Sequence, residues 1–174
     1  MNWHAANSFV GLAQSLLCQG KINEASESLQ EGFRLAHEIN APDVIVEAYC
    51  TLAEIQLAKD RLLEAEESAQ SAAKLASQIG VSPLLATAWR LTSASLLRQG
   101  NIENARQSLA NAWKALENGP DRLEDGRLHV QAMAMAMALN DREQASMHHT
   151  AAEQVFKELG ASRALSMMAS IAIN

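Results

Sequence analysis

Hydrophobic positions recur with a helical period along the whole chain, and one arrangement of hydrophobic and polar residues returns every 40 residues. The repetition is plainest between QGKINEASESLQEGF, which begins at Gln19, and QGNIENARQSLANAW, which begins at Gln99. Related segments begin at Lys59 and Leu139. Within each unit the apolar spacing follows a period of about 3.6 residues through two segments. Each unit is therefore predicted to be a helix, a tight turn and a second helix.

Residues that stop or start helices stand at fixed places in every unit. The expected turns inside units, at residue types that tolerate a left-handed backbone, are Gly20, Asp60, Gly100 and Asn140. The junctions between units hold Asn40, Gly80, Pro120 and Gly160. Pro42 and Pro83 are expected in the first turns of helices. The expected side-chain caps are Ser82, Asn101, Asp121 and Asp141, and Asp121 with Glu124 resembles a capping box.

Two sets of equivalent positions are predicted to pack the helices together. The second helices share an unbroken column of small residues, Ala25, Ala65, Ala105 and Ala145. The first helices carry Phe9, Leu12 and Ala13, then Tyr49, Leu52 and Ala53, then Trp89, Thr92 and Ser93, and last His129, Ala132 and Met133. We therefore expect one all-α solenoid over residues 1–174. Its units lie at about 2–40, 41–80, 81–120 and 121–160, and a partial fifth unit is the helix at 161–174.

The order aromatic, leucine, small residue, followed after a helical break by Ala-x-x-x-Leu-x-x-small, resembles the tetratricopeptide repeat. The resemblance covers nearly the whole chain and is weakest in the fourth unit. It implies a right-handed αα-superhelix. The 40-residue period exceeds the family's 34, and such long repeats are similar to those of bacterial signal-transducing ATPases of the maltose-regulator type and of kinesin light chains. The length of the repeat alone also allows HEAT-type repeats, but the alanine column favours the tetratricopeptide interpretation.

The charge is unevenly distributed and excludes some partners. The net charge is −6, with 5 basic and 11 acidic residues in positions 1–87 and 9 of each in positions 88–174. Because binding to phosphate groups needs clustered Lys and Arg, neither a nucleic-acid nor an anionic membrane partner is expected. The most apolar segment, Val130 to Leu139, is far shorter than the roughly 20 residues that span a bilayer. A soluble, cytoplasmic protein is expected.

No motif for catalysis stands out, and neither an enzymatic activity nor a cofactor is predicted. Cys18 and Cys50 are interpreted as reduced thiols. His148, His149 and Glu153 suggest a metal site, but neighbouring residues on a helix point about 100° apart. The remaining pair, His149 with Glu153, gives two ligands where zinc takes at least three from the protein. We therefore predict no metal, with His149 in a packing position and His148 facing water.

In the tetratricopeptide family the first helices line a concave groove, and the resemblance implies a partner-binding surface there. Its predicted residues are Asn7, Val10, Gln14, Glu47, Cys50, Glu54, Thr87, Arg90, Arg98, Arg127 and Gln131. The arginines could hold the carboxylates of an acidic peptide or could pair inside the chain with Glu54. The family's carboxylate clamp for chaperone tails uses the columns that hold Val10 and Gln14 here. Neither residue matches, so chaperone tails are not predicted.

These observations favour a non-catalytic scaffold that binds a protein or peptide, within a larger bacterial regulatory protein. The alternative, which the resemblance to maltose-regulator repeats implies, is a domain that senses a small-molecule inducer. The helix from Ser162 has no second helix to complete its unit. Either the chain is a segment of a longer protein or its open ends self-associate.

Overall fold

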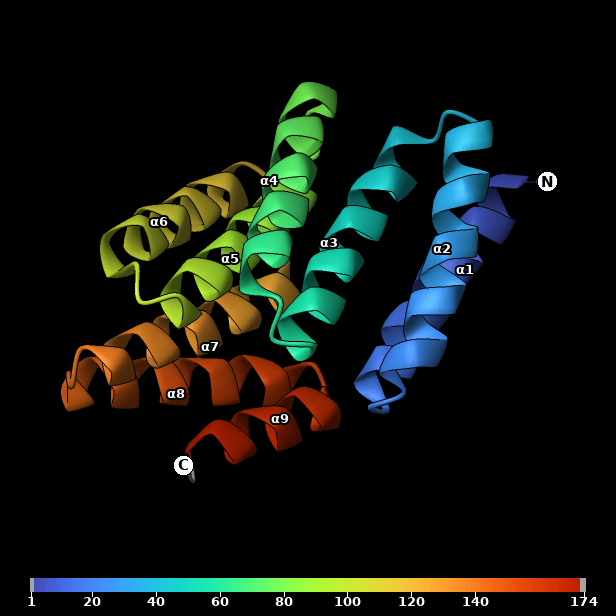
Figure 1. The fold of residues 1–174 in the computed structure, drawn as a ribbon. Helices are drawn as coiled ribbons and strands as arrows, with labels where there is room; N and C mark the ends of the chain where they lie inside the picture. Colours follow the sequence, from blue (N-terminus) through green and yellow to red (C-terminus); the bar gives the residue numbers. More distant parts are fainter. Residues whose placement is uncertain (1, 173–174) are drawn as a thin grey trace.

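The computed structural model describes residues 2–172, in which the chain forms nine helices joined by short turns and no strand (Figure 1). The helices are α1 (Asn2–Cys18), α2 (Ile22–Glu38), α3 (Pro42–Ala58), α4 (Leu62–Ile79), α5 (Ser82–Arg98), α6 (Ile102–Asn118), α7 (Arg122–Ala138), α8 (Arg142–Glu158) and α9 (Ser162–Ala172). Residues 173 and 174 of the predicted last helix lie outside the described residues. The expected all-α architecture is confirmed.

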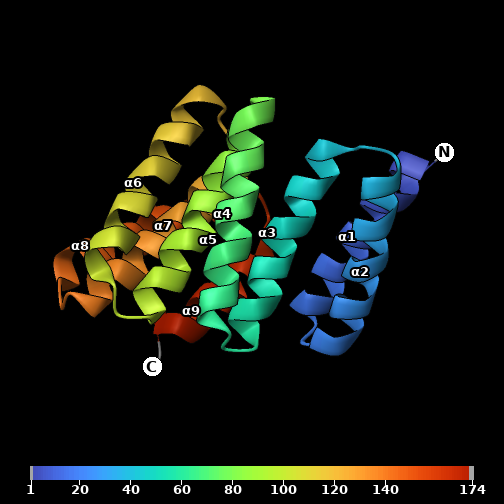
Figure 2. The ribbon, with the colours of Figure 1, turned by 45° about the horizontal axis from the view of Figure 1, so that its top comes forward.

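Each pair of consecutive helices, from α1 with α2 to α7 with α8, packs side by side as a hairpin (Figures 1 and 2). The odd-numbered helices also touch one another in a row, α1 with α3, α3 with α5 and α5 with α7. The second helix of each hairpin packs against the first helix of the next, and α9 packs against α8. None of the helices in the described part is long and apolar enough to cross a membrane.

The turns have the backbone conformation that the sequence predicts. Inside the units φ is 76° at Gly20, 59° at Asp60, 80° at Gly100 and 57° at Asn140. Between units φ is again positive at Asn40, Gly80 and Gly160. The junction at Pro120 differs, because proline cannot adopt a positive φ and the chain leaves α6 through the extended Gly119. A Cβ at Gly119 would lie 2.8 Å from Cβ of Ser82, so only glycine fits between the two segments.

Three of the four predicted caps are confirmed. The side chains of Asn101, Asp121 and Asp141 each accept a hydrogen bond from the backbone N–H three residues later. The fourth is wrong, because α5 already begins at Ser82 and its cap residue, Val81, has no side-chain bond to offer. Pro42 and Pro83 stand in the first turns of α3 and α5, as expected.

Small side chains bring the two helices of a unit close together. Ala25, Ala65 and Ala105 are completely buried. In the first unit a Cβ added to Gly32 would lie 2.9 Å from Cγ2 of Val10. Val10 therefore belongs to the core, and its predicted place in the groove is wrong. Leu12, predicted to pack, is 48% exposed, because residues two apart on a helix point in nearly opposite directions.

The fourth unit has a close approach of its own. Phe156 on α8 is 1% exposed and packs with Met133 of α7 and Met168 of α9. Its ring lies so near the backbone of α7 that a Cβ on Gly126 would be 2.5 Å from the ring atom Cε1. The absence of a side chain at Gly126 thus lets the ring join three helices in one core.

Candidate partner-binding surface

The inner surface, defined as the solvent-reachable side chains of α1, α3, α5 and α7, is the structural counterpart of the predicted groove. Eight of the eleven predicted residues are exposed or half-buried, and they are Asn7, Gln14, Glu47, Glu54, Thr87, Arg90, Arg98 and Arg127. Their role in binding stays a prediction. The other three, Val10, Cys50 and Gln131, are buried, and the side chain of Arg90 is mostly enclosed and pairs internally.

Cys50 and Gln131 are core residues, contrary to the prediction. Cys50 packs with Val46 and Leu91, and burial raises the pKa of its thiol far above the ordinary value. Gln131 is buried, and its Nε2 donates a hydrogen bond of 3.3 Å to Oγ of Ser93 on α5. These side chains hold neighbouring units together, and neither is available to a partner.

Arg90 is the centre of an ion-pair network that joins three units. Its Nε donates to Oε1 of Glu124 at 2.5 Å, and its Nη2 lies 3.6 Å from Oε1 of Glu54. Glu124 in turn lies 3.5 Å from Nη1 of Arg127. The side chain of Arg90 is 12% exposed and that of Glu124 is 3% exposed. The network connects α3, α5 and α7 across the inner surface.

Burial acts to lower the pKa of Arg90, but Glu124 and Glu54 outweigh it, so the pKa lies above its ordinary value and Arg90 is charged. Arg98 is also paired, since it donates to Oδ1 of Asp60 at 2.8 Å and to the carbonyl of Leu57 at 2.7 Å. None of the three predicted arginines therefore offers an uncompensated charge. Pairing of the arginines with carboxylates of the same chain, one of the two alternatives that the sequence allowed, is the arrangement observed.

Glu124, the main partner of Arg90, was missed in the sequence although a signal existed. Forty and eighty residues earlier the same column holds Leu84 and Val44. A carboxylate in an otherwise apolar column has to find a partner when it is buried. The capping-box pattern explained Glu124 as a helix cap instead. Only half of the box forms, because Asp121 caps the helix while the Glu124 side chain accepts a hydrogen bond from Arg90.

Glu47 gives the inner surface an acidic group. Burial and then the neighbouring Asp43 raise the pKa of its half-buried carboxyl, and no cation among the described residues offsets these effects. Asp43 accepts a hydrogen bond of 3.3 Å from the indole N–H of Trp3. Next to Glu47, Nε2 of Gln14 donates to Oγ1 of Thr51 at 3.1 Å, which links α1 to α3. This part of the surface carries negative charge.

A histidine pair in the fourth unit was also missed. Nδ1 of His129 on α7 and Nδ1 of His148 on α8 are 2.9 Å apart, and Trp113 of α6 meets His129 edge to face at 4.9 Å between ring centroids. His148 is half-buried, so the prediction that it faces water is wrong. Within residues 2–172 no three or more His, Cys, Asp or Glu side chains are grouped so that they could hold a metal ion.

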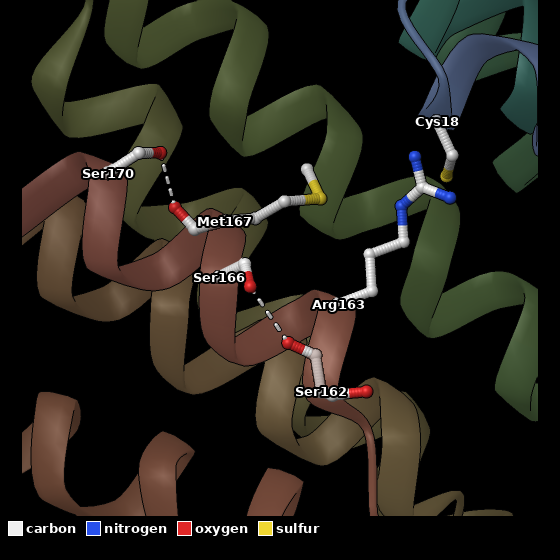
Figure 3. A pocket seen from close by; sticks show the side chains of 6 residues that line it. All are labelled: Cys18, Ser162, Arg163, Ser166, Met167 and Ser170. Carbon is white, nitrogen blue, oxygen red and sulfur yellow. Dashed lines mark hydrogen bonds between the residues drawn. The ribbon is translucent and has the colours of Figure 1, made fainter.

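A hollow of about 620 Å³ lies where the end of α1 comes near α9 (Figure 3). Its lining consists of Cys18, Ser162, Arg163, Ser166, Met167 and Ser170. Figure 3 shows the guanidinium group of Arg163 reaching toward Cys18, with the side chains of Ser166 and Met167 on α9 beside it. The hollow is thus built from the first and the last helix of the described chain.

Scans of the sequence against models of known families and against curated proteins found no match. Solved structures do resemble the chain. BtubC (BKLC) from P. vanneervenii is 18% identical with a TM-score of 0.65, and the match covers 84% of this chain and 60% of that one. The fold is that of a tetratricopeptide-like repeat solenoid.

A second tetratricopeptide-like structure is longer than the chain described here. It is a Signal Transduction ATPase with Numerous Domains (STAND) protein with a tetratricopeptide repeat sensor, from Pyrococcus horikoshii. The identity is 16% and the TM-score 0.68, and the match covers 97% of this chain but 26% of that one. The chain thus spans less than two thirds of the length of either structure. At these identities the likeness establishes the tetratricopeptide-like fold.

Proposed function

We propose that the chain is a non-catalytic module that binds a segment of another protein along its inner surface. The observation that carries this proposal is the continuous row of α1, α3, α5 and α7, whose contacts place side chains from four units on one surface. Solenoids of this type offer such extended surfaces for binding. Several of these side chains, Asn7, Glu47 and Thr87 among them, remain at least partly accessible.

The preferred partner is not the acidic peptide that the sequence suggested. Arg90, Arg98 and Arg127 are all engaged with carboxylates of the chain itself. An added acidic group would have to displace those partners, and Glu47 adds negative charge to α3. We therefore propose a partner whose charge is neutral or basic where it meets α3.

The test compares two double variants, each of which reverses the charge of one glutamate and one arginine. One variant changes the inner surface and the other changes the second helices. Glu47→Lys with Arg127→Glu alters the inner surface, whereas Glu67→Lys with Arg106→Glu alters exposed positions on the second helices α4 and α6. Proteins captured from a native lysate by the wild-type chain are identified by mass spectrometry, and the affinity of a purified partner is then measured. We expect the inner-surface variant to bind at least tenfold more weakly and the other to bind like the wild type. Equal affinity of both variants would refute the proposal.

The hollow between α1 and α9 favours a second candidate function, the sensing of a small molecule. The hollow has a volume of about 620 Å³ and is shallow and open to solvent, so a ligand there would be held mainly by the polar side chains that line it, such as Arg163 and Ser166. A ligand that contacts both Arg163 of α9 and the end of α1 at Cys18 would favour one pitch of the superhelix over others. The STAND protein whose structure the chain resembles carries its tetratricopeptide repeats as a sensor, which agrees with this candidate.

Thermal unfolding in the presence of a metabolite library tests the second candidate. A ligand at a concentration 100 times its Kd stabilises the folded chain by about 2.7 kcal/mol, which is a measurable rise in Tm. The rise is expected to disappear in Arg163→Ala and to persist in Arg142→Ala, which removes an exposed arginine from α8. A ligand that stabilises both variants equally would bind elsewhere.

We further propose that residues 1–174 form one solenoid domain of a larger cytoplasmic, bacterial regulatory protein. Both structural neighbours are longer than the chain, and one of them joins its repeats to a signal-transduction ATPase. In such an arrangement the module would recognise the partner while other domains of the protein respond.

A further inference from the structure

The contact between His129 and His148 has a counterpart in the first unit. Both pairs, Phe9 with Ser28 and His129 with His148, are separated by 19 residues, and in the first unit Oγ of Ser28 donates to the carbonyl of Phe9 at 2.9 Å. The second and third units hold Tyr49 with Ser68 and Trp89 with Ser108 at these positions. Only the fourth unit has two ionisable side chains where the two helices of the hairpin meet.

The geometry requires the pair to share one proton between the facing nitrogens. The ring centroids are 5.2 Å apart while the Nδ1 atoms are 2.9 Å apart, so the nitrogens point toward each other. One Nδ1 must carry hydrogen and the other must offer its lone pair. If both rings are protonated, two N–H groups and two positive charges face each other and the hydrogen bond is lost.

We propose that the pair is a proton-operated latch, which holds α7 to α8 while at least one ring is neutral and releases them when both rings are protonated. Because α7 also carries Glu124 and Arg127, release changes the part of the inner surface that the fourth unit contributes. The proposal concerns regulation of the fold and does not depend on the identity of any partner.

The surroundings favour the closed latch at neutral pH. Burial lowers the pKa of both histidines. For His129 the Asp125 carboxylate on the same helix opposes this effect and His148 on α8 adds to it, and the pKa remains below its ordinary value. From α6 the residue that packs against His129 is the neutral Trp113. For His148 burial is the cause of the lowered pKa.

The direction of the pH effect follows from these shifts. In the unfolded chain the histidines take up protons around the ordinary pKa of 6.5, whereas in the folded chain they do so at lower pH. The stability that the pair contributes is therefore fully present above pH 6.5 and is lost as the pH falls from there through the lowered pKa values of the folded state. Because the two sites interact, the pair titrates in two coupled steps.

The test uses a double variant that copies the first unit, His129→Phe with His148→Ser, which places there the aromatic and serine pair of Phe9 and Ser28. The matched control is His149→Gln, which changes a histidine of α8 outside the pair. Between pH 7.5 and pH 5.0 we expect the ratio of folded to unfolded wild-type protein to fall at least fivefold more than that of the double variant. The control is expected to follow the wild type.

Two further measurements separate a latch from a general loss of stability. Hydrogen exchange, corrected for its intrinsic pH dependence, should speed up at least fivefold in α7 and α8 at pH 5.0 and should not change in α1 and α2. NMR titration of the wild-type rings should give midpoints below 6.5 for both His129 and His148. Midpoints at or above that value, or exchange that rises equally in all helices, would overturn the proposal even if the double variant failed to fold.

Discussion

Replacement of Arg90 by alanine is expected to reduce the free energy of unfolding by about 3–5 kcal/mol, because it leaves a buried carboxylate without its partner. Glu124 is 3% exposed, and after the change its nearest cation would be Arg127, 3.5 Å away and itself 47% exposed. A buried charge without a close partner is far more costly than a lost ion pair at the surface. Denaturant unfolding followed by circular dichroism measures the change.

Two companion variants identify the physical cause. Arg127→Ala removes a mostly exposed member of the same network and should cost less than about 1 kcal/mol. Arg90→Met combined with Glu124→Leu removes both buried charges and should recover most of the stability that Arg90→Ala loses, because apolar side chains of similar size suit a buried site. If Arg90→Ala were as stable as Arg127→Ala, the buried network would not hold α3, α5 and α7 together.

Replacement of Phe156 by alanine is expected to destabilise the fourth unit by about 3–5 kcal/mol. The ring is 1% exposed and fills the space between α7, α8 and α9, with Gly126 directly against it. Alanine would leave a cavity beside Gly126, and the surrounding helices would not move together to fill it. Because each unit of a solenoid contacts only its neighbours, the loss should appear first in α7, α8 and α9.

Limited proteolysis with mass spectrometry detects this local opening. The Phe156→Ala chain should be cut in the segment 122–172 before any cut appears in α1 to α4. Met147→Ala is the control on the same helix, since Met147 is 56% exposed and its loss should leave the cleavage pattern unchanged. Uniform cleavage along the chain would contradict the repeat-by-repeat account of stability.

The sequence could predict what depends on local rules. The left-handed turns at Gly20 and Asn140 and the caps at Asn101 and Asp141 follow from residue type and its distance from a helix end. The period of 40 residues then repeats these rules through the chain. The helices, the turns and the tetratricopeptide-like fold could be predicted in this way.

The inner surface was harder to predict because it depends on the rotation of each helix about its axis. An error of two positions exchanged Val10, which is buried against Gly32, with Leu12, which is exposed. The pairing of Arg90 with Glu124 spans 34 residues and two units, so no local rule contains it. Even so, comparison of equivalent positions marks Glu124 and His129 as polar replacements in packed columns, and such replacements point to the buried pairs.

Binding of partners to the inner surface is tested most directly by chemical modification of carboxylates with and without a purified partner. Glu47 and Glu54 report on α3 in the inner row, whereas Glu64 and Glu67 report on the second helix α4. Mass spectrometry of the modified peptides gives the degree of protection at each position. We expect the partner to protect Glu47 and Glu54 and to leave Glu64 and Glu67 unchanged, whereas protection confined to Glu64 and Glu67 would show that the partner binds the second helices instead.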